Sequence, residues 1–298
     1  MATINYAEQY SKELANAYGY SLYSGALWSA ENANKYKVVD AKTIKIPTLT
    51  VGGRVNGDTA TIGSFTQNFS NSWETKTLSN HRCFQTLIHP TDIDRTNLVA
   101  SIANITKTFN ETQKFAEMDA YTFSKLYELK NAQEAITPQS AELTGTSAIK
   151  LFDELMDKMD EALVPATGRI LYVDTYTKTL LDTAIQITRA NGDKVISRAI
   201  SRLDEVEVVS VPTALLKTKY DFLTSPQGGF KPATEAKNIA MILLHPTAIL
   251  PVASYSFAQL EEPSALTQGK YVYYEESFED VFILNNRHNA IQIVVKNK

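Results

Sequence analysis

A segment without glycine or proline runs from residue 97 to residue 130, and any fold of this chain has to accommodate it. Its apolar residues recur at about 3.5-residue spacing, which is close to the period of an α-helix. They are Leu98, Ile102, Ile105, Phe109, Ala116, Phe123 and Tyr127. A continuous helix of this length would span roughly 50 Å. The stripe weakens between Glu111 and Glu117, so two consecutive helices or a kink is the alternative, and Pro138 ends the pattern in either case.

Helical and strand patterns alternate in the next part of the chain. Residues 148–162 carry a helical stripe that ends before Pro165 and Gly168, and Thr175 is a candidate cap for a second helix. Apolar runs predict a buried strand at residues 169–173, a central strand at residues 239–244 and a further strand at residues 206–211. Residues 220–237 contain prolines and glycines and are predicted to form a surface loop. This alternation predicts an α/β lobe.

The N-terminal part shows two less regular patterns. Tyr6, Tyr10, Leu14 and Tyr18 recur every four residues, so they form a stripe on a short helix that either packs on its own core or reaches a neighbour. Residues 43–47 predict a strand, a glycine-rich tip follows, and residues 65–88 return with alternating polarity. We expect a long two-stranded loop that needs a surface to lie on, because it has few large aliphatic residues.

The C-terminal part sets an aromatic strand beside acidic residues. Residues 271–284 and 290–295 are both strand-like, and a hairpin closing the chain is the simplest interpretation. The acidic residues are Glu275, Glu276, Glu279 and Asp280. Their mutual repulsion indicates a basic partner surface, and the alternative is a solvated acidic face.

Composition restricts the protein class further. A chain of 298 residues is long enough for two lobes, and 44% hydrophobic with 21% charged residues is typical of a globular protein. The sequence has no secretion signal and no apolar run of about twenty residues, so we expect a soluble protein that is not exported by this route. A formal net charge of −4 argues against a large nucleic-acid-binding surface.

Strong catalytic motifs are missing from the sequence. Cys83, between Arg82 and Phe84 and near His81, is the best nucleophile candidate, because neighbouring positive charge lowers the pKa of a thiol. The phrase His-Pro-Thr begins at His89 and again at His245, after strand-like runs, and a repeated strand exit is favoured over a metal site. We therefore predict no catalytic residue, no cofactor and no bound metal.

Several phrases, in this order, resemble the major capsid proteins of tailed bacteriophages, which have the Hong-Kong-type capsid fold, and especially those of phages of Gram-positive bacteria. The resemblance covers nearly the full length. It rests on residues 72–78, 88–94, 100–106, 168–173, 201–206 and 267–284.

The resemblance implies an α+β fold with four parts. These are an N-terminal arm at residues 1–40, an extended β-hairpin loop at 41–88, a peripheral domain with a long spine helix at 89–138 and 261–298, and an α/β axial domain at 139–260.

The resemblance also implies a structural protein of the virion, assembled in the cytoplasm of the bacterial host. Its partners would be other copies of itself in hexamers and pentamers, a portal protein, and packaged double-stranded DNA without sequence-specific binding, with no membrane. Because the arm begins almost at Met1, we expect a separate scaffolding protein, and we assign no Lys–Asn crosslink.

In the family, the extended loop of one subunit crosses the peripheral domain of the next. We therefore expect a basic loop to face an acidic strand and to set the register of the contact. The candidate residues are Lys42, Lys45, Arg54 and Lys76 against Glu275, Glu276, Glu279 and Asp280, with Tyr6 and Tyr10 as contacts of the arm. The alternatives are the shell of an encapsulin-like cellular nanocompartment and, more distantly, a cytosolic α/β enzyme that uses Cys83, His89 or His245.

Overall fold

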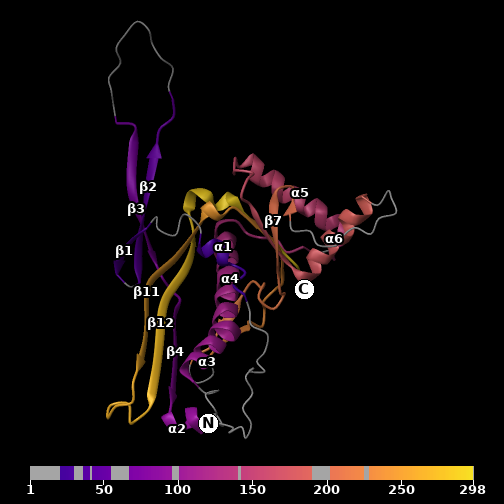
Figure 1. The fold of residues 1–298 in the computed structure, drawn as a ribbon. Coiled ribbons are helices and arrows are strands. Elements are labelled where there is room, and N and C mark those ends of the chain that lie inside the picture. Colours follow the sequence, from indigo (N-terminus) through magenta and orange to yellow (C-terminus); the bar gives the residue numbers. More distant parts are fainter. Residues whose placement is uncertain are drawn as a thin grey trace.

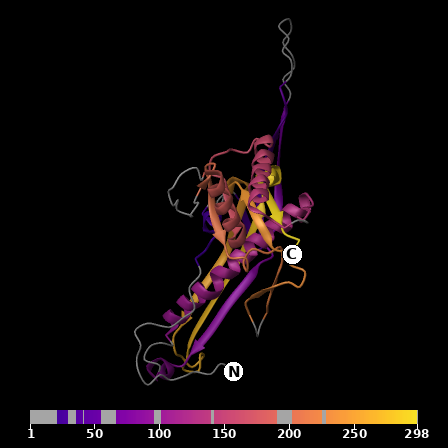
Figure 2. The ribbon, with the colours of Figure 1, turned by 90° about the vertical axis from the view of Figure 1, so that its right-hand side faces the viewer.

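The computed structural model shows an α+β protein with a long three-stranded sheet, a five-stranded sheet and a projecting hairpin (Figure 1). A spine of helices runs beside the three-stranded sheet (Figure 2). The residues described are 21–29, 36–40, 42–54, 67–95, 101–139, 142–189, 202–224 and 228–297. No helix in these ranges is both long and apolar enough to cross a membrane.

The spine consists of three helical segments in succession. Helix α3 (Ile102–Phe109) passes into a π-helical segment, η2 (Asn110–Lys114), and then into α4 (Phe115–Gln133). The Ser101 side chain caps α3 by accepting from the Asn104 N–H at 3.3 Å. The π-helical segment lies where the apolar stripe of the sequence weakens, so the interrupted helix is the correct alternative. The helix also ends before Pro138, at Gln133.

The five-stranded sheet has the order β13-β10-β5-β7-β6. Its strands are β5 (Ile170–Asp174), β6 (Arg202–Leu203), β7 (Val206–Val211), β10 (Ile239–Leu244) and β13 (Ile291–Val295). Strand β5 pairs parallel with β7 and antiparallel with β10. Every residue of β5, β10 and β13 is buried, so both faces of the sheet are covered there. The predicted buried strand at residues 169–173 and the central strand at residues 239–244 are confirmed, and the strand predicted at residues 206–211 forms with only its two end residues buried.

Helices cover this sheet. The Phe123 ring of α4 lies 5.1 Å from the Tyr172 ring of β5, centroid to centroid. Helices α5 (Gly145–Glu161) and α6 (Thr175–Arg189) pack on the sheet through the buried side chains of Phe152 and Leu181. The Thr144 and Ser147 side chains form a capping box at the start of α5. The helical stripe expected at residues 148–162 is therefore confirmed, with the helix ending at Glu161.

The three-stranded sheet has the order β11-β12-β4, with β4 at His81–Ile88, β11 at Ile249–Glu261 and β12 at Tyr271–Ile283. The expected closing hairpin between β12 and β13 is wrong. Strand β12 pairs with β11 and β4, and β13 pairs with β10. The 3₁₀ segment η4 (Asn285–Ala290) separates them. Four of the five residues of β13 are apolar and all five are buried, and the five-stranded sheet covers both of its faces.

The projecting hairpin consists of β2 (Thr43–Val51) and β3 (Phe69–Thr77), with the short strand β1 (Lys37–Asp40) beside β2. The long two-stranded loop is confirmed, but its returning strand ends at Thr77. Residues 81–88 instead form β4 in another sheet, after a turn at residues 78–80. At its base, Ile44 and Ile46 are buried in a second core cluster with Leu78, Leu250, Val252, Phe278 and Phe282.

The surface loop expected at residues 220–237 contains a small hairpin of β8 (Tyr220–Phe222) and β9 (Phe230–Pro232). The other short helices are α1 (Gly25–Trp28), α2 (Pro90–Arg95) and η3 (Pro246–Ala248).

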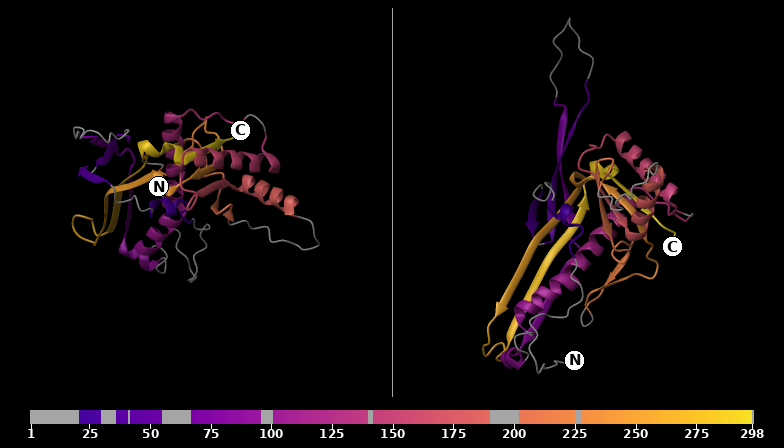
Figure 3. Two further views of the ribbon diagram at one scale, coloured as in Figure 1. Left: turned by 90° about the horizontal axis from the view of Figure 1, so that it is seen from above. Right: turned by 45° about the vertical axis from the view of Figure 1, so that its right-hand side comes forward.

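The predicted boundary between residues 139–260 and residues 261–298 does not match the way in which the strands are divided between the two sheets. Strand β11 lies with β12 and β4, whereas β13 lies with β10 and β5. The chain crosses from one sheet to the other at η3 and crosses back at η4 (Figure 3). The other domain boundaries stay a prediction.

Candidate assembly surfaces

The acidic residues of β12 do not form one negative face. Adjacent residues of a strand point to opposite faces of its sheet, which separates Glu275 from Glu276. The Lys114 Nζ lies 2.9 Å from Glu275 Oε1, and the Tyr273 hydroxyl donates to Glu275 Oε2 at 2.6 Å. On the other face, the His81 Nε2 lies 3.4 Å from Glu276 Oε2. Both carboxylates therefore have partners within the chain.

Two tyrosines donate hydrogen bonds to these carboxylates, and their pKa values are raised. Burial, followed by the hydrogen bond to Glu275, raises the pKa of Tyr273 to about 12. The Tyr274 hydroxyl donates to Glu276 Oε2 at 2.6 Å, and this bond raises the pKa of Tyr274 to about 12. The same bond holds the pKa of Glu276 below its ordinary value. Both phenols consequently stay protonated at neutral pH.

Asp280 is not a surface residue. It is 1% exposed, and its carboxylate accepts from the backbone N–H of Ser79 at 2.8 Å and from the Tyr121 hydroxyl at 2.8 Å. The Ser79 hydroxyl and the Val281 N–H are further donors, at 3.1 and 2.8 Å. The prediction that Asp280 faces a neighbouring subunit is therefore corrected, because its carboxylate organises the turn between β3 and β4. Glu279, half-buried, has no ion pair within the described residues.

The predicted basic residues lie along the hairpin. Lys42 Nζ sits 5.7 Å from the centroid of the Phe278 ring, and Lys76 Nζ pairs with Glu74 at 2.6 Å. Lys45 is half-buried and Arg54 is exposed. Within the described residues, none of the four pairs with a carboxylate of β12, so their contact with another subunit stays a prediction. Tyr6 and Tyr10 lie outside the described residues.

The hairpin exposes an apolar face that the sequence interpretation missed. Cross-strand pairing sets Pro47 opposite Trp73 and Val51 opposite Phe69, all on the face opposite Ile44 and Ile46. We call this set the hairpin stripe: Pro47, Leu49, Val51, Phe69 and Trp73. All five residues are exposed, Leu49 by 63% and Trp73 by 53%. The period-2 alternation of residues 47–51 was the signal that could have revealed it.

The opposite face of the hairpin is polar beyond its base. It carries Thr48, Thr50, Ser70 and Ser72, and the Thr48 and Ser72 hydroxyls lie 2.6 Å apart. A two-stranded ribbon with one polar and one apolar face is stable in water only if the apolar face is covered. Because the hairpin projects from the body, the remainder of the described chain does not cover it (Figure 1).

A second apolar surface lies on the three-stranded sheet, on the face away from the spine. The Phe84 ring of β4 stacks on Phe109 of the spine at 3.8 Å, so the alternate residues Cys83 and Leu87 point outward. Pairing with β12 and β11 adds further residues to this face. We call this set the outer sheet face: Cys83, Leu87, Tyr255, Phe257 and Tyr274. Leu87 is 60% exposed, and Tyr255 and Phe257 are each 39% exposed.

The residues of the enzyme alternative are dispersed. Cys83 is exposed on the outer sheet face, whereas Arg82 points to the opposite face and binds Glu117. His89 and His245 sit in two copies of one local structure. In each, the His Nδ1 lies 2.7 Å from the Thr hydroxyl two residues later, and a short helix begins at the intervening proline. The repeated phrase is thus a repeated strand exit. The described residues contain no group of three potential metal ligands.

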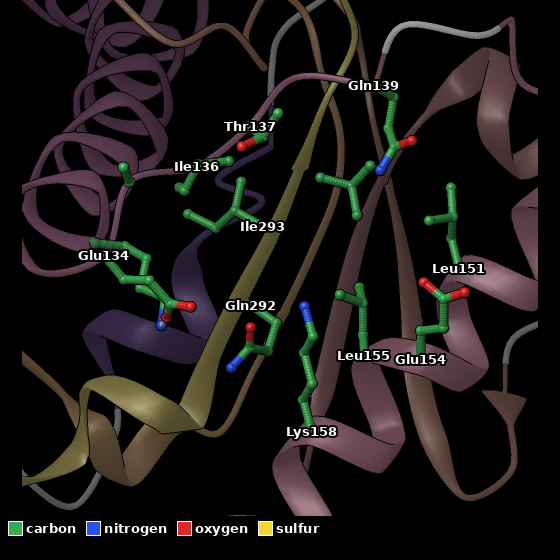
Figure 4. Close-up of a pocket in the computed structure, with 13 residues that line it drawn as sticks. Glu134, Ile136, Thr137, Gln139, Leu151, Glu154, Leu155, Lys158, Gln292 and Ile293 are labelled. Atoms are coloured by element: carbon green, nitrogen blue, oxygen red, sulfur yellow. Dashed lines mark hydrogen bonds and ion pairs between the residues drawn. The ribbon is translucent and has the colours of Figure 1, made fainter.

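A pocket of about 260 Å³ lies between the end of α4, helix α5 and β13 (Figure 4). The buried Lys130 donates from Nζ to Glu134 Oε2 at 2.8 Å and to the His288 carbonyl at 3.3 Å. Lys158, Gln139 and Gln292 supply the other polar walls. Cys83, His89 and His245 do not line this pocket.

Comparison with known proteins identifies the fold. No family model and no curated protein matches the sequence. Solved structures match over nearly the whole chain. A chain of the mature capsid of bacteriophage PhiM1 has a TM-score of 0.67 at 13% identity, covering 99% of this chain and 93% of that one.

Two further matches have similar quality. A chain from Mycobacterium phage Che8 has a TM-score of 0.62 at 14% identity, covering 99% of this chain and 98% of that one. A chain from the capsid of cyanophage P-SCSP1u has a TM-score of 0.63 at 12% identity, covering 98% and 93%. The protein therefore has the fold of phage capsid chains, as the sequence resemblance implies. Another matching structure is the head of Helicobacter pylori bacteriophage KHP40, so a link to phages of Gram-positive bacteria stays a prediction.

Proposed function

We propose that this protein is the major capsid protein of a tailed phage, a structural subunit whose copies form the icosahedral shell around a double-stranded DNA genome. The observation that carries the proposal is the correspondence of fold over 99% of this chain with capsid chains. Its place is the virion, after assembly in the cytoplasm of the host. The role needs no catalytic residue, because repeated contacts between copies produce the container.

The apolar surfaces support a specific contact between copies. At the base of the hairpin, Ile44 and Ile46 already pack on Phe278 at one end of the three-stranded sheet. Within the described residues, Leu87, Tyr255 and Phe257 of the outer sheet face are exposed, and so is the hairpin stripe. A hairpin from one copy that lies across the outer sheet face of the next would bury both surfaces. Burial of aromatic residues would supply most of the affinity.

Charge would then set the register rather than the affinity. Glu276 lies on the outer sheet face, where the His81 Nε2 is 3.4 Å away, whereas Glu275 and Glu279 alternate with it on the face toward the spine. Lys45 and Arg54 of a neighbouring hairpin, which have no ion pair in the described ranges, would face Glu276. Charge reversal at Glu276 should therefore weaken assembly at low salt, and unchanged assembly at every salt concentration would contradict this contact.

The remaining partners follow from the same role. Hexamers and pentamers of the chain would build the shell, with a separate scaffolding protein during assembly and a portal protein at one vertex. A net charge of −4 suits a container that must fill with DNA without binding it tightly.

The direct test is electron microscopy of the purified protein, with and without a co-expressed scaffolding protein, together with light scattering. We expect closed shells or tubes, and a diameter too small for a phage genome would point to the nanocompartment alternative. A monomer under every condition would overturn the proposal.

Variants of the hairpin test the contact itself. Leu49→Ser with Trp73→Ser should leave the circular dichroism of the monomer unchanged, because both side chains are exposed, and should reduce assembly at least tenfold. The matched control is Thr50→Ser with Ser70→Ala on the polar face, which should assemble normally. Equal assembly of the two double variants would remove the hairpin stripe from the contact.

A further inference from the structure

Arg82 of β4 connects three parts of the molecule. Its Nε and Nη2 donate to the two carboxylate oxygens of Glu117, at 2.5 and 3.1 Å, in the spine helix α4. Its Nη1 donates to the Leu223 carbonyl at 3.1 Å, and Nη2 also donates to the Gly229 carbonyl at 3.3 Å. The guanidinium carbon lies 5.9 Å from the centroid of the Phe222 ring. One side chain thus binds the three-stranded sheet, the spine and the β8–β9 hairpin together.

The β8–β9 hairpin is a separate two-stranded sheet that is anchored in the core cluster of the five-stranded sheet. Tyr220 is buried in the core cluster of that sheet, and its hydroxyl donates to the Ala214 carbonyl at 2.8 Å. The Leu223 N–H donates to the Gly229 carbonyl at 2.9 Å, so the carbonyl that Arg82 contacts also closes the hairpin. Figure 3 shows this orange hairpin descending beside the spine. Arg82 therefore holds an extension of one sheet against the other.

The Arg82 contact lies at a distance from the points where the chain itself joins the two sheets. The chain joins the two sheets at η3 and η4, next to the end of β12 at Ile283. Arg82 lies opposite Ser277, which is about 20 Å further along β12 at roughly 3.3 Å per residue. The spine also packs on both sheets, through Phe109 against Phe84 and through Phe123 against Tyr172. Arg82 adds a directional polar attachment to this packing, because a forked guanidinium that binds a carboxylate bidentately has a fixed orientation.

We propose that Arg82 is a positioning residue that fixes the angle between the two sheets and thereby the curvature of the assembled shell. The inference about shell curvature rests on the proposed function, whereas the inference that Arg82 fixes the angle between the two sheets does not. A lysine cannot replace Arg82, because a single ammonium group cannot bind Glu117 bidentately and reach both carbonyls.

The test uses Arg82→Lys and Arg82→Gln in the full chain, with Lys107→Gln as the control. Lys107 lies in the same spine, pairs with Glu111 at 3.9 Å and has a side chain that is 72% exposed. Hydrogen exchange of the unassembled chain should show at least tenfold faster exchange of the Leu223 amide in both Arg82 variants, and no change in β10 or in the control. Glu117→Gln should reproduce the effect.

Electron microscopy of the same proteins then measures shell diameter. We expect a broader or shifted distribution for the Arg82 variants and an unchanged one for Lys107→Gln. If the Leu223 amide exchanges at the same rate in the Arg82 variants, Arg82 does not hold the β8–β9 hairpin in place. If the amide exchanges faster but the shell diameters are identical, Arg82 does not set the curvature of the shell. If the unmodified chain forms no shell, the proposed function fails, while the exchange experiment still decides whether Arg82 fixes the hairpin. Arg82→Lys keeps the positive charge, so it still tests the proposal if the Arg82→Gln variant does not fold.

Discussion

At the scale of single residues, two carboxylates are buried and stabilise the interior of the protein, although charged side chains are expected at the surface. Asp280 closes the turn between β3 and β4, and Asp119, which is fully buried, accepts from the N–H groups of Tyr23 and Ser24 at 2.9 and 2.8 Å. Burial raises the pKa of Asp119 above its ordinary value. In each case a carboxylate on a rigid element fixes a segment that is remote in sequence.

Asp280→Ala should lower the free energy of unfolding by about 3 kcal/mol, because it removes the buried carboxylate that accepts from the Ser79 N–H and the Tyr121 hydroxyl. Urea unfolding monitored by fluorescence measures the change. The adjacent Glu279→Ala serves as the control and should stay within about 0.5 kcal/mol of the unmodified protein. Equal effects of the two substitutions would show that the Asp280 network contributes nothing specific.

The pH dependence of Tyr273 is a second prediction at this scale. Its pKa of about 12 in the folded chain exceeds the ordinary value of about 10, so the native state retains the phenol proton more strongly than the unfolded state. The stability from this phenol is present below about pH 10 and is lost as the pH rises toward 12. Phenolate absorbance should reveal the late titration, and Tyr273→Phe identifies it by its loss.

Glu275→Gln should move the titration of Tyr273 to lower pH, because it removes a negative acceptor while leaving burial unchanged. A Tyr273 that titrates near pH 10 in the unmodified protein would contradict the hydrogen bond to Glu275.

At the scale of helices and strands, local patterns predicted most elements. They failed where the structure depends on which strands pair with each other. The spine and α5 follow from their 3.6-residue periodicity, and the buried strands follow from continuous apolar runs, because both patterns are set by local sequence. The β12–β13 hairpin was wrong because two strand-like runs separated by a short polar turn are compatible with several pairings. The β8–β9 hairpin was missed because its strands are only three residues long each.

Helix packing provides a prediction for Gly145, the first residue of α5. A Cβ at this position would lie 3.0 Å from the Ala184 Cβ and 3.2 Å from the Leu180 carbonyl oxygen. Gly145→Ala should therefore destabilise the protein by about 1–2 kcal/mol despite the better helix propensity of alanine. Thermal unfolding tests this. Gly25→Ala is the matched control, since the nearest atom to its Cβ is 3.9 Å away, and it should be neutral.

At the scale of the whole molecule, the chain closes its five-stranded sheet only with its last described residues. Strand β13 follows both crossings between the sheets and covers the side of β10 that β5 leaves open. Lys296, directly after β13, places its Nζ 2.7 Å from Asp174 Oδ2, and the other oxygen of Asp174 accepts from the Thr177 N–H at 3.1 Å. The end of the chain thus holds the junction of β5 and α6.

Lys296→Met should cost about 2 kcal/mol of folding free energy, because it leaves the buried carboxylate of Asp174 without a positive partner. Chemical denaturation provides the measurement. Lys231→Met, at an exposed position of β9, controls for the loss of a lysine and should have little effect. A cost that disappears in the Asp174→Asn background would confirm that the pair, and not packing of the Lys296 side chain, is responsible.

The sequence alone determined the spine, helix α5 and the strands with continuous apolar runs, because these patterns depend on residues within one or two turns of each other. The capsid resemblance likewise rested on short local phrases. Only the tertiary structure decided which strands pair, that Asp280 is internal, that one face of the hairpin is bare, and that Arg82 joins two sheets. These features depend on contacts such as Ser79 with Asp280, separated by 201 positions, whose formation is set by packing and not by local pattern.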